Sequence, residues 1–438
     1  MKTALAIFSL AIAAGADRKA AIDPLVQPVI DTGTAPGVVV GVLEDGKTQI
    51  FAYGKDVPNN VFEIGSITKT FTTTALAVMV ERKMVALEDP VRKYLPADAV
   101  PPGDGPEIRL IDLATQHSGL PRMPSNFKPK DPTNPYADYT PQLMYEFLSK
   151  QTLKLKPDAK FLYSNLGMGL LGHALSLRYG KSYEHMIADL VTGPMGMPET
   201  SVTLSADQLK RLAPGHNGDS QPVHNWDLDA LAGAGALRST AKDMLRYVQA
   251  NLDPPEKMKA AIELAHVKRA EVGGGMNIAL AWLIKPDGKT YWHNGGTGGY
   301  TAYASFNTER KTGVVVLINA SGTIMDVLGA QLEHVLAGEL VEPLSARRAV
   351  TLDSKTLDEY PGAYEMAPGV KMTVTRQGDQ MFGQITGQDP VRVYPSAKDK
   401  FFLRVVEASI DFDRDDQGRI TGLTLHQAGR DMKAKKVQ

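Results

Sequence analysis

A serine and a lysine, Ser66 and Lys69, stand three residues apart at the start of a strongly apolar segment. Residues at i and i+3 share one face of a helix, so the lysine amine can reach the serine hydroxyl. A serine becomes an effective nucleophile when a neighbouring base takes its proton. A lysine can be that base when desolvation or nearby positive charge destabilises its ammonium. On its own, such a pair is more often a capping serine followed by an exposed lysine, so its meaning depends on the rest of the chain.

A tyrosine and an asparagine lie in a second segment, Tyr163-Ser164-Asn165, directly before an apolar run that is typical of a helix. A tyrosine hydroxyl titrates near pH ~10, so Tyr163 needs cationic neighbours if it is to act near neutral pH. Lys69 is one candidate for such a neighbour. Asn165 could orient a substrate amide and hold Lys69 in place, or it could cap the helix that follows, and both roles are compatible.

A third segment, His293-Asn294-Gly295-Gly296, ends a predicted strand. A protonated His293 would be a second cation for Tyr163, whereas a neutral His293 would simply donate a hydrogen bond. The glycines would let a substrate lie close along the strand. The remaining histidines are scattered without metal-ligand spacing, so we expect no metal and no other cofactor.

The three segments must be brought together by the elements around them. The sequence pattern predicts that these elements include one sheet, built from strands at both ends of a domain. Residues 37–53 predict a hairpin around an Asp-Gly turn, and helical periodicity begins near Ser66. Residues 85–221 lack strand-like alternation and predict helices joined by Pro- and Gly-rich loops. After Gly273 the pattern predicts strands at 277–284, 290–293, 301–306 and 313–318 and a helix at 325–340. The fold class is therefore α/β (α+β), with an all-helical insertion in the middle of the domain.

A smaller second domain is predicted over residues 352–438, after a linker at residues 342–351. Short apolar runs follow at regular spacing between turn residues, at 370–375, 380–385, 391–394, 401–405, 408–412 and 420–426. This pattern predicts a small antiparallel barrel or sandwich. The larger domain then spans residues 17–341.

Composition excludes several classes of function. The chain has 438 residues, a formal net charge of −1 and no cysteine. The charge balance gives no reason to expect nucleic-acid binding, and the lack of cysteine excludes thiol catalysis, thiolate metal sites and disulfides. Residues 1–16 predict a secretory signal, because Lys2 precedes a short apolar run that ends in Ala14-Gly15-Ala16. We expect a periplasmic or secreted bacterial protein with no integral membrane segment after cleavage.

In their order along the chain, the three segments resemble the motifs of the serine penicillin-recognising hydrolases. The resemblance is to the branch that holds class C β-lactamases, DD-peptidases, D-amino-acid amidases and lactamase-like esterases, and it covers roughly residues 23–340. It implies an antiparallel sheet flanked by helices, and Ser66 as a nucleophile that forms an acyl-enzyme. Either Lys69 or Tyr163 would be the base. The C-terminal segment resembles the small β-domain of many members, with its role and the oligomeric state left open.

The same resemblance implies the remaining site residues. It assigns substrate contacts to Asn165, His293, Asn294 and Gly295, and an oxyanion hole to the backbone N–H groups of Ser66 and Gly296. His293 stands where β-lactamases commonly have lysine, and Asn294 stands where a hydroxyl residue usually helps to bind a substrate carboxylate. These two departures argue against strong recognition of penicillins.

Three hypotheses of function follow. The first is an exported serine hydrolase of amide or ester bonds, acting on small esters or on D-amino-acid peptides derived from peptidoglycan, as a DD-carboxypeptidase or aminopeptidase does. The second is a class C-like β-lactamase. The third is a sensor that is acylated by penicillin or peptidoglycan without turnover.

Overall fold

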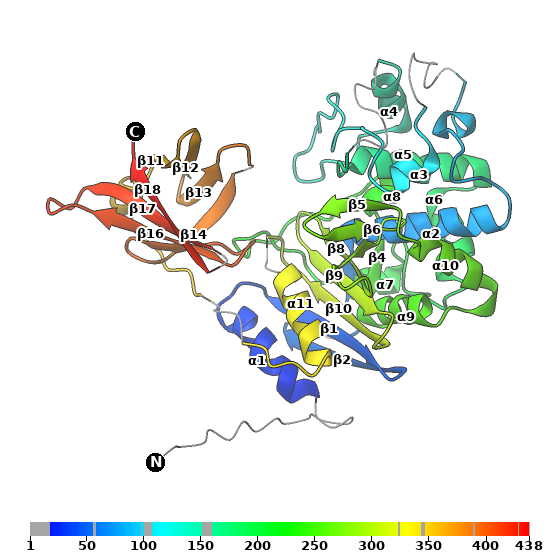
Figure 1. Ribbon diagram of the computed structural model, residues 1–438, viewed down its shortest axis with the longest axis horizontal. Coiled ribbons are helices and arrows are strands. Elements are labelled where there is room, and N and C mark those ends of the chain that lie inside the picture. The colour runs from blue at the N-terminus through cyan, green and yellow to red at the C-terminus, as the bar shows by residue number, and fades with distance from the viewer. Residues whose placement is uncertain are drawn as a thin grey trace.

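The computed structural model describes residues 18–437 except 56–57, 98, 100–106, 151–159, 323–324, 343–346, 389 and 428. It consists of a larger body built on an open sheet and a smaller C-terminal barrel (Figure 1). The predicted signal at residues 1–16 lies outside the described residues.

The larger body is built on an eight-stranded antiparallel sheet with the order β2-β1-β10-β9-β8-β7-β6-β5. The strands β1 and β10 come from opposite ends of the domain and pair directly, with Val38 opposite Ile318. Both ends of the domain therefore contribute to one sheet, as the sequence predicts. The strands are β1 (Gly37–Glu44), β2 (Lys47–Gly54), β5 (Ala270–Gly273), β6 (Met276–Ile278), β7 (Leu283–Ile284), β8 (Thr290–Gly296), β9 (Thr301–Asn307) and β10 (Thr312–Ile318).

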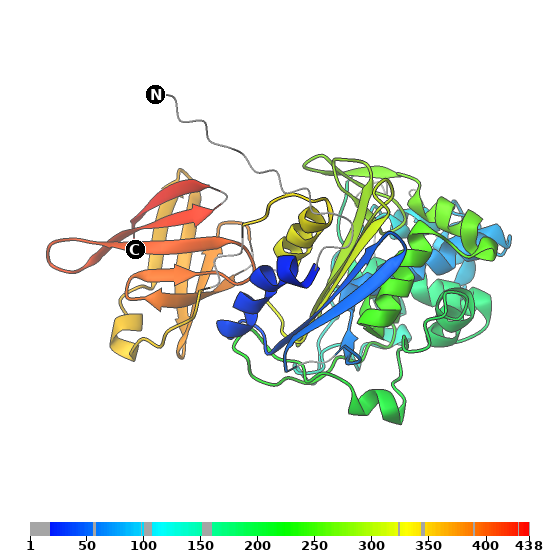
Figure 2. The ribbon, with the colours of Figure 1, turned by 90° about the horizontal axis from the view of Figure 1, so that it is seen from below.

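Helices cover both faces of this sheet, because successive strand residues point to opposite sides. On one face, Val38 of β1 packs in an apolar cluster with residues of α1 (Arg18–Asp31) and α11 (Met325–Leu336). On the other face, Val39 packs in a larger cluster with residues of α2 (Thr68–Glu81) and α9 (Ala241–Leu252). Figure 2 shows α1 in blue and α11 in yellow between the sheet and the barrel.

The middle of the domain is helical, and its described residues form no extended strand between positions 85 and 221. This confirms the predicted insertion. A short two-stranded sheet of β3 (Val61–Glu63) and β4 (Arg238–Thr240) joins its two ends. The helices of this region and its borders are α3 (Leu110–Ala114), α4 (Pro141–Leu148), α5 (Asn165–Tyr179), α6 (Tyr183–Ile187), α7 (Ala206–Lys210), α8 (Ala232–Gly235) and α10 (Lys259–His266).

The single strand predicted at 277–284 is wrong in part, because residues 279–282 leave the ladder between β6 and β7. Ala281 adopts a left-handed φ of 62°, and its N–H donates to the Ala114 carbonyl at 2.9 Å. The Leu280 carbonyl accepts from the Thr73 hydroxyl at 2.8 Å. Helices α2 and α3 therefore satisfy backbone groups that a neighbouring strand would otherwise satisfy.

The C-terminal domain is a closed antiparallel barrel of eight strands. Five of the six predicted runs lie within strands, and the run at 401–405 is a strand only at its first two residues, because β15 ends at Phe402. Strand β11 pairs with β18 to close the barrel. Four aromatic side chains, Tyr360, Tyr364, Phe401 and Phe412, pack together in its core. The strands are β11 (Gly362–Ala367), β12 (Val370–Gln377), β13 (Gln380–Ile385), β14 (Val391–Ala397), β15 (Lys400–Phe402), β16 (Ala408–Arg414), β17 (Ile420–Gln427) and β18 (Arg430–Lys436).

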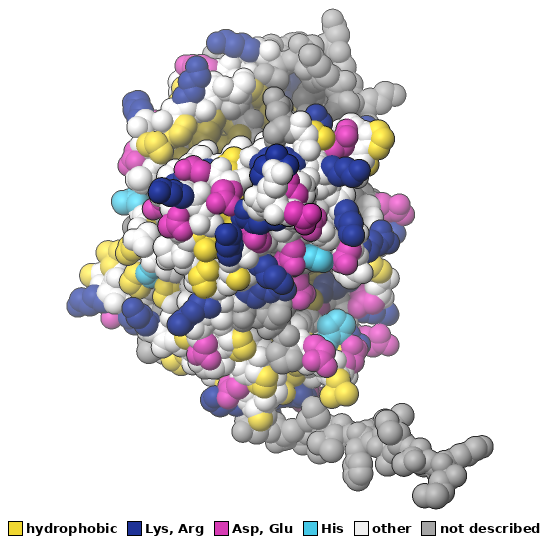
Figure 3. Space-filling view, turned by 90° about the vertical axis from the view of Figure 1, so that its left-hand side faces the viewer, with side chains coloured by type: hydrophobic (Ala, Val, Ile, Leu, Met, Phe, Trp, Pro, Cys, Tyr) yellow, Lys and Arg dark blue, Asp and Glu magenta, His cyan; other side chains and the backbone are white. Residues whose placement is uncertain are grey.

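The surface on the barrel side carries basic and acidic side chains that are interspersed (Figure 3). This agrees with the formal net charge of −1. In the part of the chain that the structure describes, no helix is long and apolar enough to cross a membrane.

Candidate active site

Ser66 lies in a short 3₁₀ turn, Gly65–Ile67, and Lys69 lies in the first turn of α2. Gly65 has a left-handed φ of 49°, which favours glycine where the chain turns from β3 into the helix. The Lys69 side chain is fully buried, and its Nζ donates to Ser66 Oγ at 2.8 Å and to the Ala234 carbonyl at 2.7 Å. The structure therefore joins the two residues of the first motif directly.

The electrostatic environment of Lys69 favours its neutral form. Burial lowers the pKa of Lys69 well below its usual value, and the positive charge of Arg122 lowers this pKa further. A neutral amine keeps a lone pair that can take a proton, whereas an ammonium has none. The hydrogen-bonded amine is thus suited to act as a base toward Ser66.

Tyr163 approaches the same point from the loop before α5. Its hydroxyl is hydrogen-bonded to Ser66, and the centroid of its ring lies 4.9 Å from Lys69 Nζ and 5.2 Å from Arg122 Cζ. Burial raises the pKa of Tyr163 to about 12, although the Ser66 hydrogen bond and the charge of Arg122 oppose the rise. Near neutral pH the tyrosine is protonated and can donate a hydrogen bond.

Ser164, not Asn165, caps helix α5. The Ser164 hydroxyl accepts from the Gly167 N–H at 2.8 Å and donates to the Pro121 carbonyl at 2.7 Å. Asn165 is the first residue of the helix, and its side-chain amide donates to Met123 Sδ at 3.9 Å. Among the described residues, no hydrogen bond joins the Asn165 side chain to Lys69. Its amide faces the loop that carries Arg122.

His293 is buried in the middle of β8, which runs on to Gly296 beyond the predicted end at 293, and it faces the Lys69 side of the site. Burial, and next the charge of Lys69, lower the pKa of His293 to about 4. Its Nδ1 lies 2.6 Å from the Asn294 carbonyl, which is the geometry of a ring N–H donor. The structure therefore supports the neutral, hydrogen-bonding alternative for His293 and not a cation at this position.

Asn294 is turned away from Ser66 and toward α11. Its Nδ2 lies 2.9 Å from both carboxylate oxygens of Asp326. Neighbouring residues of a strand project to opposite faces, so His293 and Asn294 serve different sides of the sheet. The side-chain N–H donors of Asn294 are thus directed to the protein rather than to a substrate.

Glycines allow the end of β8 to lie against the Ser66 turn. A Cβ atom added to Gly295 would lie 2.0 Å from the Ile64 carbonyl oxygen and 3.0 Å from Ser66 N. A Cβ added to Gly65 would lie 2.7 Å from Gly296 N. The backbones of Gly295 and Gly296 therefore lie directly against the Ser66 turn.

Two features of the site have no motif in the sequence. Arg122 follows the Gly119-Leu120-Pro121 turn directly, and its charge acts on both Lys69 and Tyr163. Trp226 stands beside the β8–β9 turn, where its Nε1 would lie 2.7 Å from a Cβ at Gly298. Only the folded chain brings these residues to the site. In the described residues, no group of three or more His, Asp or Glu side chains is placed to hold a metal ion.

An active-site serine paired with a buried lysine, on a helix packed against an antiparallel sheet, defines a class of acyl-transferring hydrolases. The family model described as Beta-lactamase matches residues 22–339, and the chain belongs to this family of serine hydrolases. A second model, a domain of unknown function (DUF3471), matches residues 346–438.

Known relatives agree with this assignment. The chain is 31% identical over 314 residues to the D-alanyl-D-alanine-carboxypeptidase/endopeptidase AmpH of Escherichia coli strain K12, covering 66% of this chain and 80% of AmpH. It is 28% identical over 385 residues to penicillin-binding protein 4* of Bacillus subtilis, covering 81% and 83% of the two chains.

Solved structures show the same fold. A class C β-lactamase in complex with cefoxitin superposes with a TM-score of 0.63 at 25% identity, covering 71% of this chain and 96% of its own. The octameric penicillin-binding protein homologue from Pyrococcus abyssi has a TM-score of 0.63 at 22% identity and covers 94% of this chain and 98% of its own. The second likeness extends over both parts of the molecule.

Proposed function

We propose that the protein hydrolyses amide or ester bonds through an acyl-enzyme on Ser66. The observation that carries this proposal is the 2.8 Å contact between a fully buried Lys69 Nζ and Ser66 Oγ. In the first step, the neutral amine takes the Ser66 proton while Oγ bonds to the substrate carbonyl carbon. The negative charge that develops on the carbonyl oxygen is held by the N–H groups of Ser66 and Gly296.

Tyr163 supplies the proton that the departing group needs. Its pKa of about 12 keeps the hydroxyl protonated, and it lies beside the reacting Oγ. The hydroxyl passes its proton to the leaving amine or alcohol, and the proton held by Lys69 then restores it. Water releases the acyl group by the reverse sequence, with Lys69 again as the base. In this proposal Lys69, rather than Tyr163, is the base.

The choice of substrate follows from the charge at the strand end, and we infer neutral acyl groups as the preferred substrates. His293 carries no proton charge near neutral pH, and the Asn294 amide is directed to Asp326. This edge of β8 therefore offers a substrate carboxylate neither a cation nor a side-chain donor from position 294. Small esters and D-amino-acid peptides without a carboxylate beside the cleaved bond fit better than penicillins or peptides that end in a free D-alanine, because that carboxylate needs such a partner. The names of AmpH and penicillin-binding protein 4* are consistent with a substrate from the cell wall.

A hydrolysis panel tests the proposal. It compares short p-nitrophenyl esters, D-alanine p-nitroanilide, a D-Ala-D-Ala peptide and nitrocefin with the purified protein and its Ser66→Ala variant. We expect Ser66-dependent turnover of esters or D-amino-acid substrates, and weaker turnover of nitrocefin. Equal rates for the two proteins would refute the role of Ser66. If mass spectrometry still detects the acyl group of a substrate on Ser66 hours after mixing, a sensor would be favoured over a hydrolase.

Residues 1–16 would direct the protein out of the cytoplasm, and we propose a periplasmic or secreted location. The support is the sequence pattern of that segment. Fractionation of cells that express the full chain, with N-terminal sequencing of the mature protein, checks this. A protein that retains Met1 and stays in the cytoplasm would contradict it.

A further inference from the structure

One loop of the hydrolase domain connects the barrel to the active-site edge of the sheet. We call residues 214–226 the latch loop. This loop begins beside the β8–β9 turn, reaches the barrel, and returns to the hydrolase domain at Trp226. The two ends of the latch loop contact the hydrolase domain, and its tip, Gly218 and Asp219, contacts the barrel.

The carboxylate at the tip of the latch loop pairs with the barrel. Asp219 Oδ2 accepts from Arg392 Nη1 at 2.6 Å and from Gln380 Nε2 at 2.8 Å. The Arg392 side chain is 22% exposed and the Asp219 side chain is 26% exposed, so solvent only partly screens this ion pair.

The backbone next to this carboxylate is held as well. The Gly218 carbonyl accepts from Arg404 Nη1 at 2.6 Å and from the Tyr394 hydroxyl at 3.0 Å. Arg404 is buried, and its Cζ lies 4.3 Å from the centroid of the Tyr394 ring. A charged donor on a backbone carbonyl makes a stronger hydrogen bond than a neutral one. The tip is therefore clamped by two arginines of the barrel.

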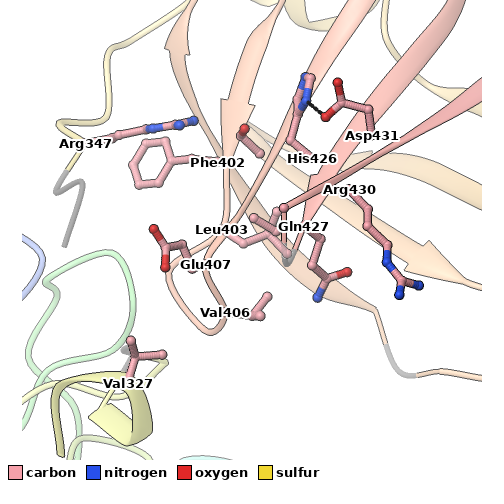
Figure 4. A pocket seen from close by; sticks show the side chains of 13 residues that line it. Val327, Arg347, Phe402, Leu403, Val406, Glu407, His426, Gln427, Arg430 and Asp431 are labelled. Atoms are coloured by element: carbon pink, nitrogen blue, oxygen red, sulfur yellow. Dashed lines mark hydrogen bonds and ion pairs between the residues drawn. The ribbon is translucent and has the colours of Figure 1, made fainter. Parts of the chain in front are cut away.

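A neighbouring part of the interface is open. A pocket of about 570 Å³ lies between Val327 of α11 and barrel residues that include Phe402, Val406 and Glu407 (Figure 4). On this side the two parts of the molecule enclose a cavity, whereas at the latch loop they are in direct contact.

The first leg of the latch loop rests on the β8–β9 turn. The His216 N–H lies 3.1 Å from the Gly299 carbonyl and 3.0 Å from the Asn319 carbonyl. A Cβ at Gly215 would lie 2.7 Å from the Tyr300 ring, so the backbone of the leg packs directly on that ring. This contact lies only three residues beyond Gly296, whose backbone lies against the Ser66 turn.

The second leg ends at Trp226, which forms a wall beside the site. The Trp226 N–H donates to Glu63 Oε1 at 2.9 Å, and the Trp226 carbonyl accepts from Arg238 Nη2 at 2.9 Å. The Trp226 ring lies 5.0 Å from the Tyr136 ring, which in turn is close enough to Tyr163 to affect its pKa. Two partly exposed aromatic rings therefore stand between the β8–β9 turn and Tyr163.

We propose that the barrel sets the acyl-group specificity of Ser66 by clamping the latch loop, with Arg392 and Arg404 as positioning residues. The proposal rests on the proposed function, because it concerns which substrates that site accepts. Local opening of a loop costs less free energy when some of the contacts that hold it are removed. Loss of the clamp loosens the Trp226 wall and the β8–β9 turn. The binding of a bulky acyl group that contacts the Trp226 ring should therefore weaken, whereas an acetyl group is too small to contact that ring.

The test compares two esters across latch variants of the full chain. The variants are Asp219→Ala, which removes the carboxylate, and Gly218→Ala, whose Cβ would lie 2.6 Å from the Tyr394 hydroxyl. For p-nitrophenyl phenylacetate we expect kcat/KM to fall at least tenfold, mainly through KM. For p-nitrophenyl acetate we expect less than a twofold change. Arg392→Lys should recover part of the loss that Arg392→Gln causes.

A matched control and a second measurement keep the outcomes distinct. Arg419→Gln removes an ion pair with Asp415 inside the barrel, away from the latch loop, and should leave both esters unchanged. Hydrogen exchange of the peptide that covers residues 296–300 should speed up in Asp219→Ala and not in Arg419→Gln. Equal loss on both esters, or unchanged exchange in Asp219→Ala, overturns the proposal. If neither ester is turned over by Ser66 in the unmodified protein, the proposed function fails and hydrogen exchange alone decides on the clamp.

Discussion

Gly295→Ala tests whether the site depends on the close approach of β8 to the Ser66 turn. The added Cβ would lie 2.0 Å from the Ile64 carbonyl oxygen and 2.9 Å from its carbon. Ordinary contact begins near 3.4 Å, so the two backbones must separate by more than ~1 Å. The Ile64 carbonyl also accepts from the Ile67 N–H at 3.2 Å, so this oxygen has little freedom to move. The strain therefore displaces the strand end that carries Gly296.

The expected effect has a catalytic part and a stability part. A misplacement of about 1 Å between catalytic groups costs on the order of 100-fold in rate. Overpacking of this kind typically costs about 1–3 kcal/mol of folding free energy. We therefore expect kcat/KM for p-nitrophenyl acetate to fall about 100-fold in a protein that is still folded at room temperature.

The assay pairs ester hydrolysis with urea unfolding of each variant. Gly296→Ala should lower the free energy of unfolding far less than Gly295→Ala, since nothing lies within 4 Å of a Cβ atom added at Gly296. Gly383→Ala in the barrel is the matched control, because its nearest contact, with Val393 Cγ1, is an ordinary 3.5 Å. A folded Gly295→Ala protein with activity within threefold of the unmodified protein would refute the reasoning.

Three further changes have defined outcomes. Arg122→Gln removes a charge that lowers the pKa of Lys69, so the acidic limb of the pH profile of kcat/KM should move to higher pH. Ser164→Ala removes the cap of α5 and should lower the free energy of unfolding, measured in urea, by about 1 kcal/mol. Burial lowers the pKa of His266 to about 4 from 6.5. The unfolded chain binds that proton first as the pH falls, so stability should drop between pH 6.5 and 4 by at most roughly 3 kcal/mol. His266→Gln should make this part of the stability profile flatter.

Each of these outcomes has a clear opposite. An acidic limb that stays in place in Arg122→Gln would remove the arginine from the electrostatics of Lys69. An unchanged unfolding midpoint in Ser164→Ala would mean that the cap contributes nothing to stability. A His266→Gln protein that loses stability with acid as steeply as the unmodified protein would assign the acid loss to other groups.

Sequence alone predicts much of this fold because the apolar patterning of the central elements is strong. Strands such as β1 and β10 are valine-rich and buried, and α2 carries an apolar run, Ala75 to Val80, in its second half. The strand at 277–284 is mispredicted because Thr73 and Ala114, distant in sequence, bind its backbone. Such tertiary hydrogen bonds leave no local pattern.

The strands β11 and β18 escape prediction for a different reason. β18 has the sequence Arg-Asp-Met-Lys-Ala-Lys-Lys, in which most side chains are exposed and charged. A strand that contributes one small buried residue, Ala434, to the core carries almost no alternating signal. Pairing with β11 and β17, which no local pattern shows, holds it in place.

The candidate site divides in the same way. The contact between Ser66, in the 3₁₀ turn, and Lys69, in the first turn of α2, can be predicted because it is local. The protonation state of His293 depends on its burial in the folded protein. The direction of the Asn294 amide depends on Asp326, which lies 32 residues further along the chain in α11. Arg122 and Trp226 belong to loops without periodicity, so only their positions in the folded chain reveal them.

The pairing of β1 with β10 has a consequence for the order in which this protein forms during synthesis. Val38 finds Ile318 only after nearly the whole hydrolase domain has been made, and Gly295 meets the Ser66 turn equally late. Pairings this distant in sequence form slowly, since a long loop must close before any contact is gained. A growing chain therefore carries Ser66 and Lys69 without the end of β8 beside them until the last strands of the sheet have been made.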